Sequence, residues 1–330
     1  MDSLKRAKNP PLKSISLNSP AKLNLYLKVF NKRKDGFHNI ETVLEKINLC
    51  DQLILKNNKA GRIKILSNHS ACPCDKTNLC YKAAEILKKT QKVPFGVDIT
   101  IRKNIPVGSG LGGGSSNAAF TLLGLNRLWG LNLSRAKLLS YAKRLGSDVA
   151  FFVYPESFAL GSGRGELIRP LKGIRPLWHI LIVPNIRLST AEAYKRIEIL
   201  RRQASRRKSS FRGVKPATKS LHTKMLTKTS SNVNILIHAL RRNKLSLLSK
   251  RLFNDFGESL FRTYPGLFKI QNRLKGLGVK GFSFSGKGPS VFGLPESRKE
   301  ALNLRRKLAK QYRVYVVRTF SEMQEDHLWR

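Results

Sequence analysis

The alternation of apolar and polar positions divides the first half of the chain into short strands and longer helices. Over residues 21–29 every second side chain is apolar and those between are polar, a period typical of a strand. Apolar positions three and four residues apart instead indicate helices. We predict strands at residues 21–29, 52–56, 62–66 and 97–101, helices at 78–89, at about 118–128 and from Ser134 to about 145, and a hairpin with strands at 157–160 and 166–168.

Strands and helices alternate in the second half, which predicts an α/β sandwich. Between residues 201 and 230 basic residues, Ser and Thr are frequent and acidic residues are absent, which predicts a flexible solvated insertion. The predicted strands cover residues 179–183, 281–284, 291–294 and 312–319, and the helices begin near Thr190 and cover 235–241, 245–253, 265–277 and 298–311. The predicted organisation is a disordered basic tail (1–13), an N-terminal domain (14–172) and a C-terminal domain (173–330) that carries the insertion at about 201–230.

A glycine-rich segment joins the strand at 97–101 to the helix that follows. Five glycines lie between Gly108 and Gly114, and glycine permits backbone conformations that bring N–H groups close to a ligand. The start of the helix adds unpaired N–H donors and the positive end of its dipole, and Ser115 and Ser116 offer hydroxyls to a phosphate or to Mg²⁺. The segment is therefore a predicted anion-binding loop.

Other glycine-rich motifs fit this segment less well. The spacing of Gly108, Gly110 and Gly113 matches a dinucleotide-binding loop. Such a loop needs an acidic residue further along the chain to bind the ribose, and no acidic residue occurs from 115 to 147. A P-loop requires a closing Gly-Lys-Ser/Thr, which is missing. The tripeptide at 255–257 (Asp-Phe-Gly) occurs without a His-Arg-Asp catalytic loop, so a protein kinase is excluded. A flexible linker is disfavoured because the glycines stand between two periodic elements.

The net charge of the chain is unusual. Sixty-three Lys and Arg oppose 20 Asp and Glu, a formal charge of +43 in 330 residues. Such a charge favours polyanions, either nucleic acid or an anionic membrane surface, and speeds the capture of phosphorylated substrates. The basic residues are spread along the chain, so a basic composition without a dedicated binding patch remains the alternative. At 41% hydrophobic residues the chain is predicted to fold.

Cysteine content and apolar runs bear on the cellular compartment. The four cysteines do not form a disulfide framework, which indicates a reducing compartment, and no apolar run approaches the length of a membrane span. The N-terminus lacks a signal-type apolar core. We therefore expect a cytoplasmic protein. We also expect it to be a monomer or a homodimer. His69, Cys72, Cys74 and Cys80 could together bind a metal, but their spacing is not a usual zinc pattern.

Two charged residues, Lys22 and Asp148, each allow two interpretations. Lys22 and Asn24 lie on the polar face of the first strand, where alternation alone predicts contact with solvent. Asp148 precedes an apolar segment at 149–153, and a lone Asp there is either a helix N-cap or a catalytic group. The residues alone leave both questions open.

Five motifs, in this order, resemble the GHMP small-molecule kinases. They are Pro-Ala-Lys-Leu-Asn-Leu at 20–25, Asp-Gly-Phe-His at 35–38, the glycine loop at 105–117, Gly-Ser-Asp-Val at 146–149 and Ser-Gly-Lys-Gly-Pro-Ser at 285–290. The resemblance runs from about residue 19 to 319. The first two motifs point to the branch whose substrate is a cytidine-diphosphate-linked methylerythritol on the non-mevalonate route to isoprenoids.

The resemblance implies an α+β fold of two domains, the first like the second domain of ribosomal protein S5 and the second ferredoxin-like. It also implies ATP and Mg²⁺ as cofactors, with ATP phosphates on the glycine loop and Ser115 as a candidate for the metal. The nucleotide-binding residues implied are Pro106, Gly108, Gly110, Leu111, Gly112, Gly113, Gly114, Ser115 and Ser116, with Asn78, Leu79 and Lys103 at the adenosine and Ser285, Gly286 and Gly288 in a second glycine loop.

For the reaction, the resemblance implies that Asp148 is the catalytic base and Lys22 its partner. The substrate-binding residues implied are Asn24, Phe37, His38, Thr190 and Tyr194, of which His38 would hydrogen-bond the cytosine between Phe37 and Tyr194. Transfer to an alcohol needs a group to accept its proton and positive charge on the migrating phosphoryl, which these residue types supply.

The chain departs from the family pattern at three positions and in one segment. Phe37 stands where tyrosine is frequent, Lys287 where a small residue is usual, and Ala150 where proline is common. The insertion at 201–230 has no counterpart in the pattern. The alternatives are a related kinase for mevalonate or homoserine, and an RNA-associated protein on the same fold, which the +43 charge suggests.

Overall fold

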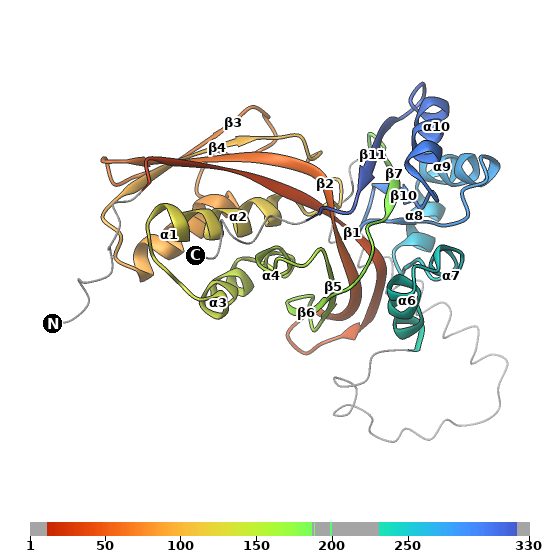
Figure 1. The fold of residues 1–330 in the computed structure, drawn as a ribbon, viewed down its shortest axis with the longest axis horizontal. Helices are drawn as coiled ribbons and strands as arrows, with labels where there is room; N and C mark the ends of the chain where they lie inside the picture. Colours follow the sequence, from red (N-terminus) through yellow and green to blue (C-terminus); the bar gives the residue numbers. More distant parts are fainter. Residues whose placement is uncertain (1–11, 187, 189–198, 200–230, 322–330) are drawn as a thin grey trace, which may run out of the picture.

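A computed structural model describes residues 12–186, 188, 199 and 231–321. Most of the predicted tail and the whole insertion at 201–230 lie outside the described residues, as do the helix expected near Thr190 and the residues Thr190 and Tyr194. The described chain forms two layered halves side by side, joined by the long strands of the first half (Figure 1).

A seven-stranded sheet organises the first half. Its strands are β1 (Ser14–Lys32), β2 (His38–Asn58), β3 (Ile63–Ser67), β4 (Gly96–Arg102), β5 (Phe158–Ser162), β6 (Leu167–Leu171) and β8 (Phe253–Asn254). The order is β3-β4-β2-β1-β8, and β5 pairs with the start of β2 and with β6. All pairs are antiparallel except β3 with β4 and β1 with β8.

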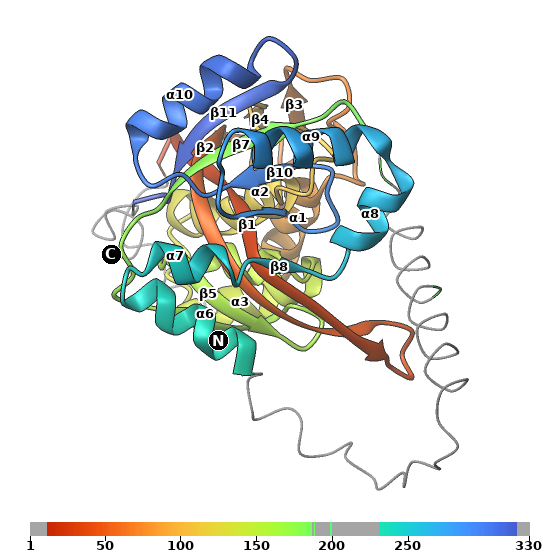
Figure 2. The same cartoon turned by 90° about the vertical axis from the view of Figure 1, so that its right-hand side faces the viewer.

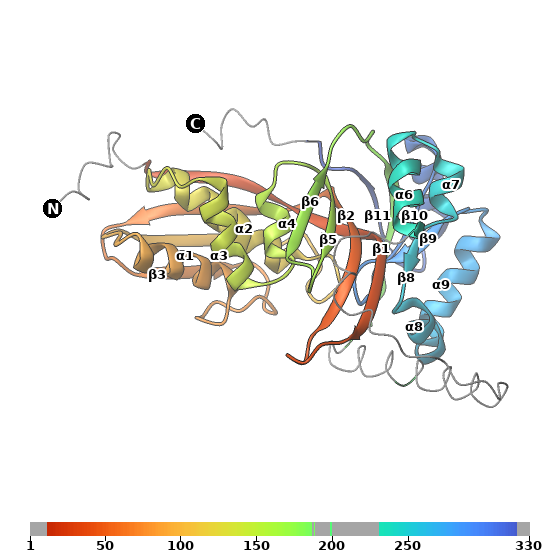
Figure 3. The ribbon, with the colours of Figure 1, turned by 90° about the horizontal axis from the view of Figure 1, so that it is seen from below.

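Helices α1 (Leu79–Thr90), α2 (Gly113–Leu128), α3 (Arg135–Leu145) and α4 (Val149–Val153) cover one face of this sheet (Figure 1, and from below in Figure 3). Helix α2 is buried on almost every side, because the sheet lies on one side of it and the other helices on the other. Ser134 accepts a hydrogen bond from the N–H of Lys137 and caps α3, as its position predicted. The glycine loop is thus anchored to the most buried helix.

The second half contains a four-stranded antiparallel sheet in the order β11-β7-β10-β9. Its strands are β7 (Trp178–Val183), β9 (Phe282–Phe284), β10 (Val291–Gly293) and β11 (Arg313–Arg318), and its helices are α6 (Ser231–Arg241), α7 (Leu245–Ser249), α8 (Gly257–Thr263), α9 (Pro265–Gly276) and α10 (Arg298–Leu308). Alternate residues of β7 serve two cores, Ile180 and Ile182 with α9 and α10, and Leu181 and Val183 with α6 (Figure 2).

An apolar core and a buried polar cluster join the two halves. Ala21 and Leu23 of β1 belong to the same core cluster as Leu181 and Phe292 of the second sheet. Beside this core, the Glu45 carboxylate accepts hydrogen bonds from His179 Nε2, at 2.9 and 3.0 Å, and from the Thr319 hydroxyl at 2.5 Å. The Glu45 and His179 side chains are fully buried. The halves are therefore held in a defined relative position.

The expected α+β class is confirmed, and three details differ from the prediction. Strand β2 begins at His38 rather than near residue 52, since its first half pairs with β1 and β5 and both its faces are buried there, which removes the two-residue period. The helix expected at 245–253 ends at Ser249, and the chain then forms β8 on the edge of the first sheet. Helix α8 was not predicted. In the described part, no helix has the length and apolarity needed to cross a membrane.

The buried Lys46 makes folding stability dependent on pH. Its ammonium contacts the Tyr154 carbonyl and lies 5.3 Å from the centroid of the Phe151 ring. Burial lowers the pKa of Lys46 to about 7 from 10.5, against the attraction of Glu156. Between these two values the folded state binds fewer protons than the unfolded chain, so the free energy of unfolding rises with pH in this window.

We therefore expect Lys46→Met to stabilise the protein more at pH 6 than at pH 9, by a difference on the order of 2 kcal/mol. Urea unfolding of both proteins at the two pH values measures it. Substitution of the exposed Lys299 by Met is the matched control, and an equal effect of Lys46→Met at both pH values would contradict the expectation.

Candidate active site

The predicted anion-binding loop connects β4 to α2. Gly108, Gly110 and Gly112 have φ angles of 69°, 80° and 71°, in the region that favours glycine. Gly112 is the N-cap of α2 and provides no side-chain hydrogen bond to the helix. A 16-residue helix thus begins at the loop without a side-chain cap, and its first N–H groups and dipole suit a phosphate.

The second glycine loop, residues 285–290, packs directly on the first. Ser285 Oγ donates to the Gly110 carbonyl at 3.0 Å and lies 3.2 Å from the Lys22 carbonyl, and Ser290 N donates to the Ser109 carbonyl at 3.3 Å. A Cβ at position 110 would lie 2.3 Å from the Ser285 carbonyl oxygen. Glycine is therefore required where the loops meet, and the structure brings Ser285, Gly286 and Gly288 next to the first loop.

Lys22 lies between the two loops. Its Nζ donates to Asn24 Oδ1 at 2.5 Å, and the Gly286 N–H donates to the same oxygen at 2.7 Å. A Cβ at position 112 would lie 2.9 Å from Lys22 Cγ. Lys22 and Asn24 are 3% and 4% exposed, so the solvent contact that alternation alone predicted is wrong. Both faces of β1 are covered here, one by α2 and one by the second half.

Asn24 is held in turn by β2. Its Nδ2 donates to Thr42 Oγ1 at 2.8 Å, and the Thr42 hydroxyl donates to the Tyr26 carbonyl at 2.7 Å. This chain of buried hydrogen bonds orients the Asn24 amide so that its oxygen faces Lys22. Thr42 was not predicted, because a threonine in a strand is an ordinary residue.

Asp148 is the acidic member of the site. It occupies the N-cap position of α4, but its side chain makes no capping hydrogen bond, so the interpretation of Asp148 as a helix cap has no support. Burial lowers the pKa of Lys22, the negative charge of Asp148 opposes that shift, and the positive charge of Lys287 adds to it. Asp148 and both lysines are therefore close enough to interact.

The residues implied at the adenosine lie in two places. Asn78 caps α1, with its Oδ1 accepting from Cys80 N at 2.8 Å and its Nδ2 donating to the Pro73 carbonyl at 2.6 Å. Leu79 begins α1 and is half-buried. Lys103 forms a buried ion pair with Asp51, whose other oxygen accepts two backbone N–H groups at 2.8 Å.

Asp51 was missed, because one carboxylate beside a strand carries no pattern. It orients Lys103 toward α2, where a Cβ on Gly113 would lie 3.1 Å from Lys103 Nζ. Lys103 is thus a cation at the start of α2, beside the glycine loop.

The two serines at the start of α2 differ. Ser116 is fully buried and its Oγ lies 2.7 Å from Ser19 Oγ, so its hydroxyl serves the interior. Ser115 is only partly buried. Of the two serines, we therefore propose Ser115 as the one whose hydroxyl lies near Mg²⁺. His69, Cys72, Cys74 and Cys80 do not form a metal site, since the described residues contain no group of three or more potential ligands.

The predicted cytosine-binding residues lie at the turn between β1 and β2. Phe37 is 54% exposed, and the Arg164 guanidinium lies 4.9 Å from its ring centroid. His38 begins β2 with its Nδ1 at 2.9 Å from the Phe30 carbonyl. With Nδ1–H donating to that carbonyl, Nε2 is the acceptor.

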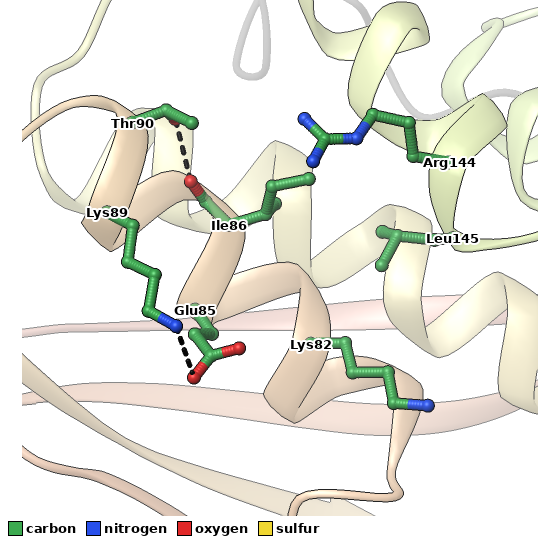
Figure 4. A pocket seen from close by; sticks show the side chains of 7 residues that line it. All are labelled: Lys82, Glu85, Ile86, Lys89, Thr90, Arg144 and Leu145. Carbon is green, nitrogen blue, oxygen red and sulfur yellow. Dashed lines mark hydrogen bonds and ion pairs between the residues drawn. The ribbon is translucent and has the colours of Figure 1, made fainter.

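A groove lies between α1 and α3 (Figure 4). It is lined by Lys82, Glu85, Ile86, Lys89, Thr90, Arg144 and Leu145, and Glu85 pairs with Lys89 across one helical turn. None of these residues belongs to the predicted site, so we assign the groove no role in binding ATP or the substrate.

Comparisons with known proteins test the family resemblance inferred from the motifs. Family models described as the GHMP kinases N-terminal domain and GHMP kinases C-terminal match residues 78–156 and 236–314. The 4-diphosphocytidyl-2-C-methyl-D-erythritol kinases of Shouchella clausii and Geobacillus kaustophilus are 39% and 37% identical to this chain, over 85% and 86% of it and 86% and 88% of their own lengths.

Solved structures show the same fold. A crystal structure of 4-(cytidine 5'-diphospho)-2C-methyl-D-erythritol kinase superposes with a TM-score of 0.71 and 27% identity, covering 93% of this chain and all of the other. Homoserine kinase from Cytophaga hutchinsonii has a TM-score of 0.69 at 19% identity, covering 96% of this chain and 97% of its own, which shows only a shared fold. The resemblance inferred from the motifs is confirmed, and the chain belongs to the GHMP kinases and, within them, to the 4-diphosphocytidyl-2-C-methyl-D-erythritol kinase family.

Proposed function

We propose that this protein transfers the γ-phosphoryl of ATP to the 2-hydroxyl of 4-diphosphocytidyl-2-C-methyl-D-erythritol, giving the 2-phosphate in the methylerythritol phosphate route to isoprenoids. The single observation that carries the proposal is the position of Lys22, buried between two glycine loops and close to Asp148. Family membership supports the substrate. The reaction site then lies between the domains proposed at 14–172 and 173–330.

Asp148 accepts the proton of the substrate hydroxyl as the phosphoryl is transferred. The positive charge of Lys22 attracts that carboxylate and balances charge that develops on the transferred group. Because Lys22 donates to Asn24, whose amide oxygen also accepts from the Gly286 N–H, little reorganisation is needed during the reaction.

The backbone N–H groups at 108–115 and the start of α2 bind the ATP phosphates in this proposal, and Lys103 lies beside them. Mg²⁺ would neutralise phosphate charge, with the Ser115 hydroxyl as the protein group offered to it. The adenosine lies near Asn78 and Leu79.

On the substrate side, His38 Nε2 accepts a hydrogen bond from the exocyclic amine of cytosine. The exposed Phe37 ring can stack on the base, and the Arg164 guanidinium lies 4.9 Å from the centroid of this ring. Thr190 and Tyr194 complete the proposed substrate contacts, with Tyr194 on the second face of the base. A guanidinium beside this stack also suits a diphosphate-linked substrate.

ADP release with Mg-ATP tests the proposal, with the cytidine substrate, mevalonate and homoserine compared side by side. Turnover with the cytidine substrate alone is expected. Turnover with mevalonate or homoserine instead would overturn the choice of substrate, and none with any alcohol, despite ATP binding, would overturn the kinase assignment. As a second arm, His38→Ala should raise KM for the cytidine substrate about tenfold or more and leave KM for ATP nearly unchanged.

The +43 charge supports a secondary proposal. An RNA-associated protein has no use for the arrangement of Lys22, Asp148 and the two loops, so polyanion association would accompany the kinase activity through the insertion at about 201–230. Loss of this association at high salt or on deletion of the insertion is the expected result.

A cytoplasmic location is likewise proposed, supported by the absence of disulfides among the four cysteines.

A further inference from the structure

Lys287 lies in the second glycine loop, where the backbone is held by two strands and by a hydrogen bond within the loop. The Gly286 N–H donates to Asn24 of β1, the Gly286 carbonyl accepts from Asn254 Nδ2 of β8 at 2.8 Å, and Gly288 N donates to the Ser285 carbonyl at 2.9 Å. Gly286 and Gly288 have φ angles of 57° and 75°. This fixed backbone determines where the Lys287 side chain begins.

The loop places Lys287 next to the reacting groups. A Cβ on the preceding residue, Gly286, would lie 3.1 Å from Lys22 Nζ. The Lys287 side chain is partly buried, and the carboxylate of Asp148 attracts it. In the described part of the chain, the charged groups that act on Lys22 are thus Asp148 from the start of α4 and Lys287 from the β9–β10 loop. Strand β2 faces Lys22 with the neutral Thr42 through Asn24.

Among the residues that the structure describes, Lys22, Lys287 and Asp148 thus act on one another. Burial of a lysine is costly unless an anion accompanies it, so a site with two partly or fully buried lysines favours anionic ligands. Phosphate groups of ATP and of the product would bring negative charge to the point where the two glycine loops meet.

We propose that Lys287 is a second phosphate-binding cation of the active site, which acts with Lys22 on the phosphoryl group during its transfer. The inference rests on the proposed function and deepens it. An alkylammonium at this position is a departure from the small residue that the family pattern has there, so the role belongs to this chain.

The first test uses the protein without substrates and reads the position of Lys287 directly. Burial and Lys287 both lower the pKa of Lys22. Lys287→Gln removes one like charge, so the pKa of Lys22 should rise. Titration of ¹³Cε-labelled lysine by NMR, with the Lys22 signal assigned through Lys22→Arg, measures this pKa in the wild type and the variant.

The matched control is Lys299→Gln, which removes the same charge from an exposed position on α10. It should leave the Lys22 titration unchanged. An unchanged Lys22 titration in Lys287→Gln would overturn the placement of Lys287 whether or not the protein phosphorylates the proposed substrate. Wild-type turnover tests the proposed function separately.

The second test is kinetic. Lys287→Gln should lower kcat about 10- to 100-fold, as expected for loss of one charged hydrogen bond to the transferred group, with a smaller change in KM for ATP. Lys287→Arg should retain activity within about threefold, since it preserves the charge. Equal activity of Lys287→Gln and wild type, or an equal loss in the Gln and Arg variants, would overturn the catalytic role.

Discussion

Asp148→Asn is expected to lower kcat for phosphorylation of the cytidine substrate by about 10²- to 10⁴-fold, the range for removal of a general base. The amide keeps the size of the side chain and loses the ability to accept a proton. Because Asp148 makes no capping hydrogen bond to α4, the helix should be undisturbed. ATP affinity and thermal stability should therefore stay close to those of the wild type.

The measurement is single-turnover kinetics with saturating ATP, together with calorimetric titration of ATP. Asp98→Asn is the matched control, because Asp98 lies in β4 and accepts a hydrogen bond from Asn58 Nδ2 that an amide oxygen can also accept. Wild-type kcat in Asp148→Asn would exclude Asp148 as the base. A loss of activity accompanied by unfolding would instead show that Asp148 is needed for the fold.

The second large effect is expected at the junction of the two halves. His179→Ala removes the partner of Glu45, a carboxylate with no exposed surface that then retains Thr319 as a hydrogen-bond donor. Loss of a hydrogen bond to a buried carboxylate, together with loss of the packed imidazole ring, is expected to cost about 3–5 kcal/mol. Unfolding by urea should therefore show a decrease of that size in the free energy of unfolding.

A double variant separates the loss of the pair from the loss of packing. His179→Leu with Glu45→Leu replaces both partners by apolar groups, so it should be more stable than His179→Ala alone. Arg262→Ala breaks an exposed pair with Glu258 and should cost about 0.5 kcal/mol or less. A cost of His179→Ala no larger than that of Arg262→Ala would contradict the importance of the buried pair.

The tautomer of His179 bears on this prediction. Within the described structure, the buried His179 Nδ1 has no hydrogen-bond partner. An unpaired acceptor is cheaper to bury than an unpaired N–H of an imidazolium, so we assign the neutral ring with Nε2–H donating to Glu45. Hydrogen bonding to a charged acceptor then connects β2 to β7 within the apolar junction.

Local sequence determined the elements that have one exposed face and the loops that require glycine. The strand at 97–101 and helix α1 followed from their periods, and Gly108, Gly110 and Gly112 marked a segment in which φ is positive. These features depend on neighbours within a few residues along the chain. The order of motifs, including Asp148 and Lys22, was also sufficient to identify the family.

The tertiary structure alone decided which polar residues are buried together. Lys22 reads as solvated on an isolated strand, and only the packing of α2 and the second glycine loop over β1 buries it against Asn24. The partnerships of Asp51 with Lys103 and Glu45 with His179 join residues 52 and 134 positions apart. A period reports the surroundings of one element, whereas burial and charge pairing arise when distant elements meet, so no local pattern encodes them.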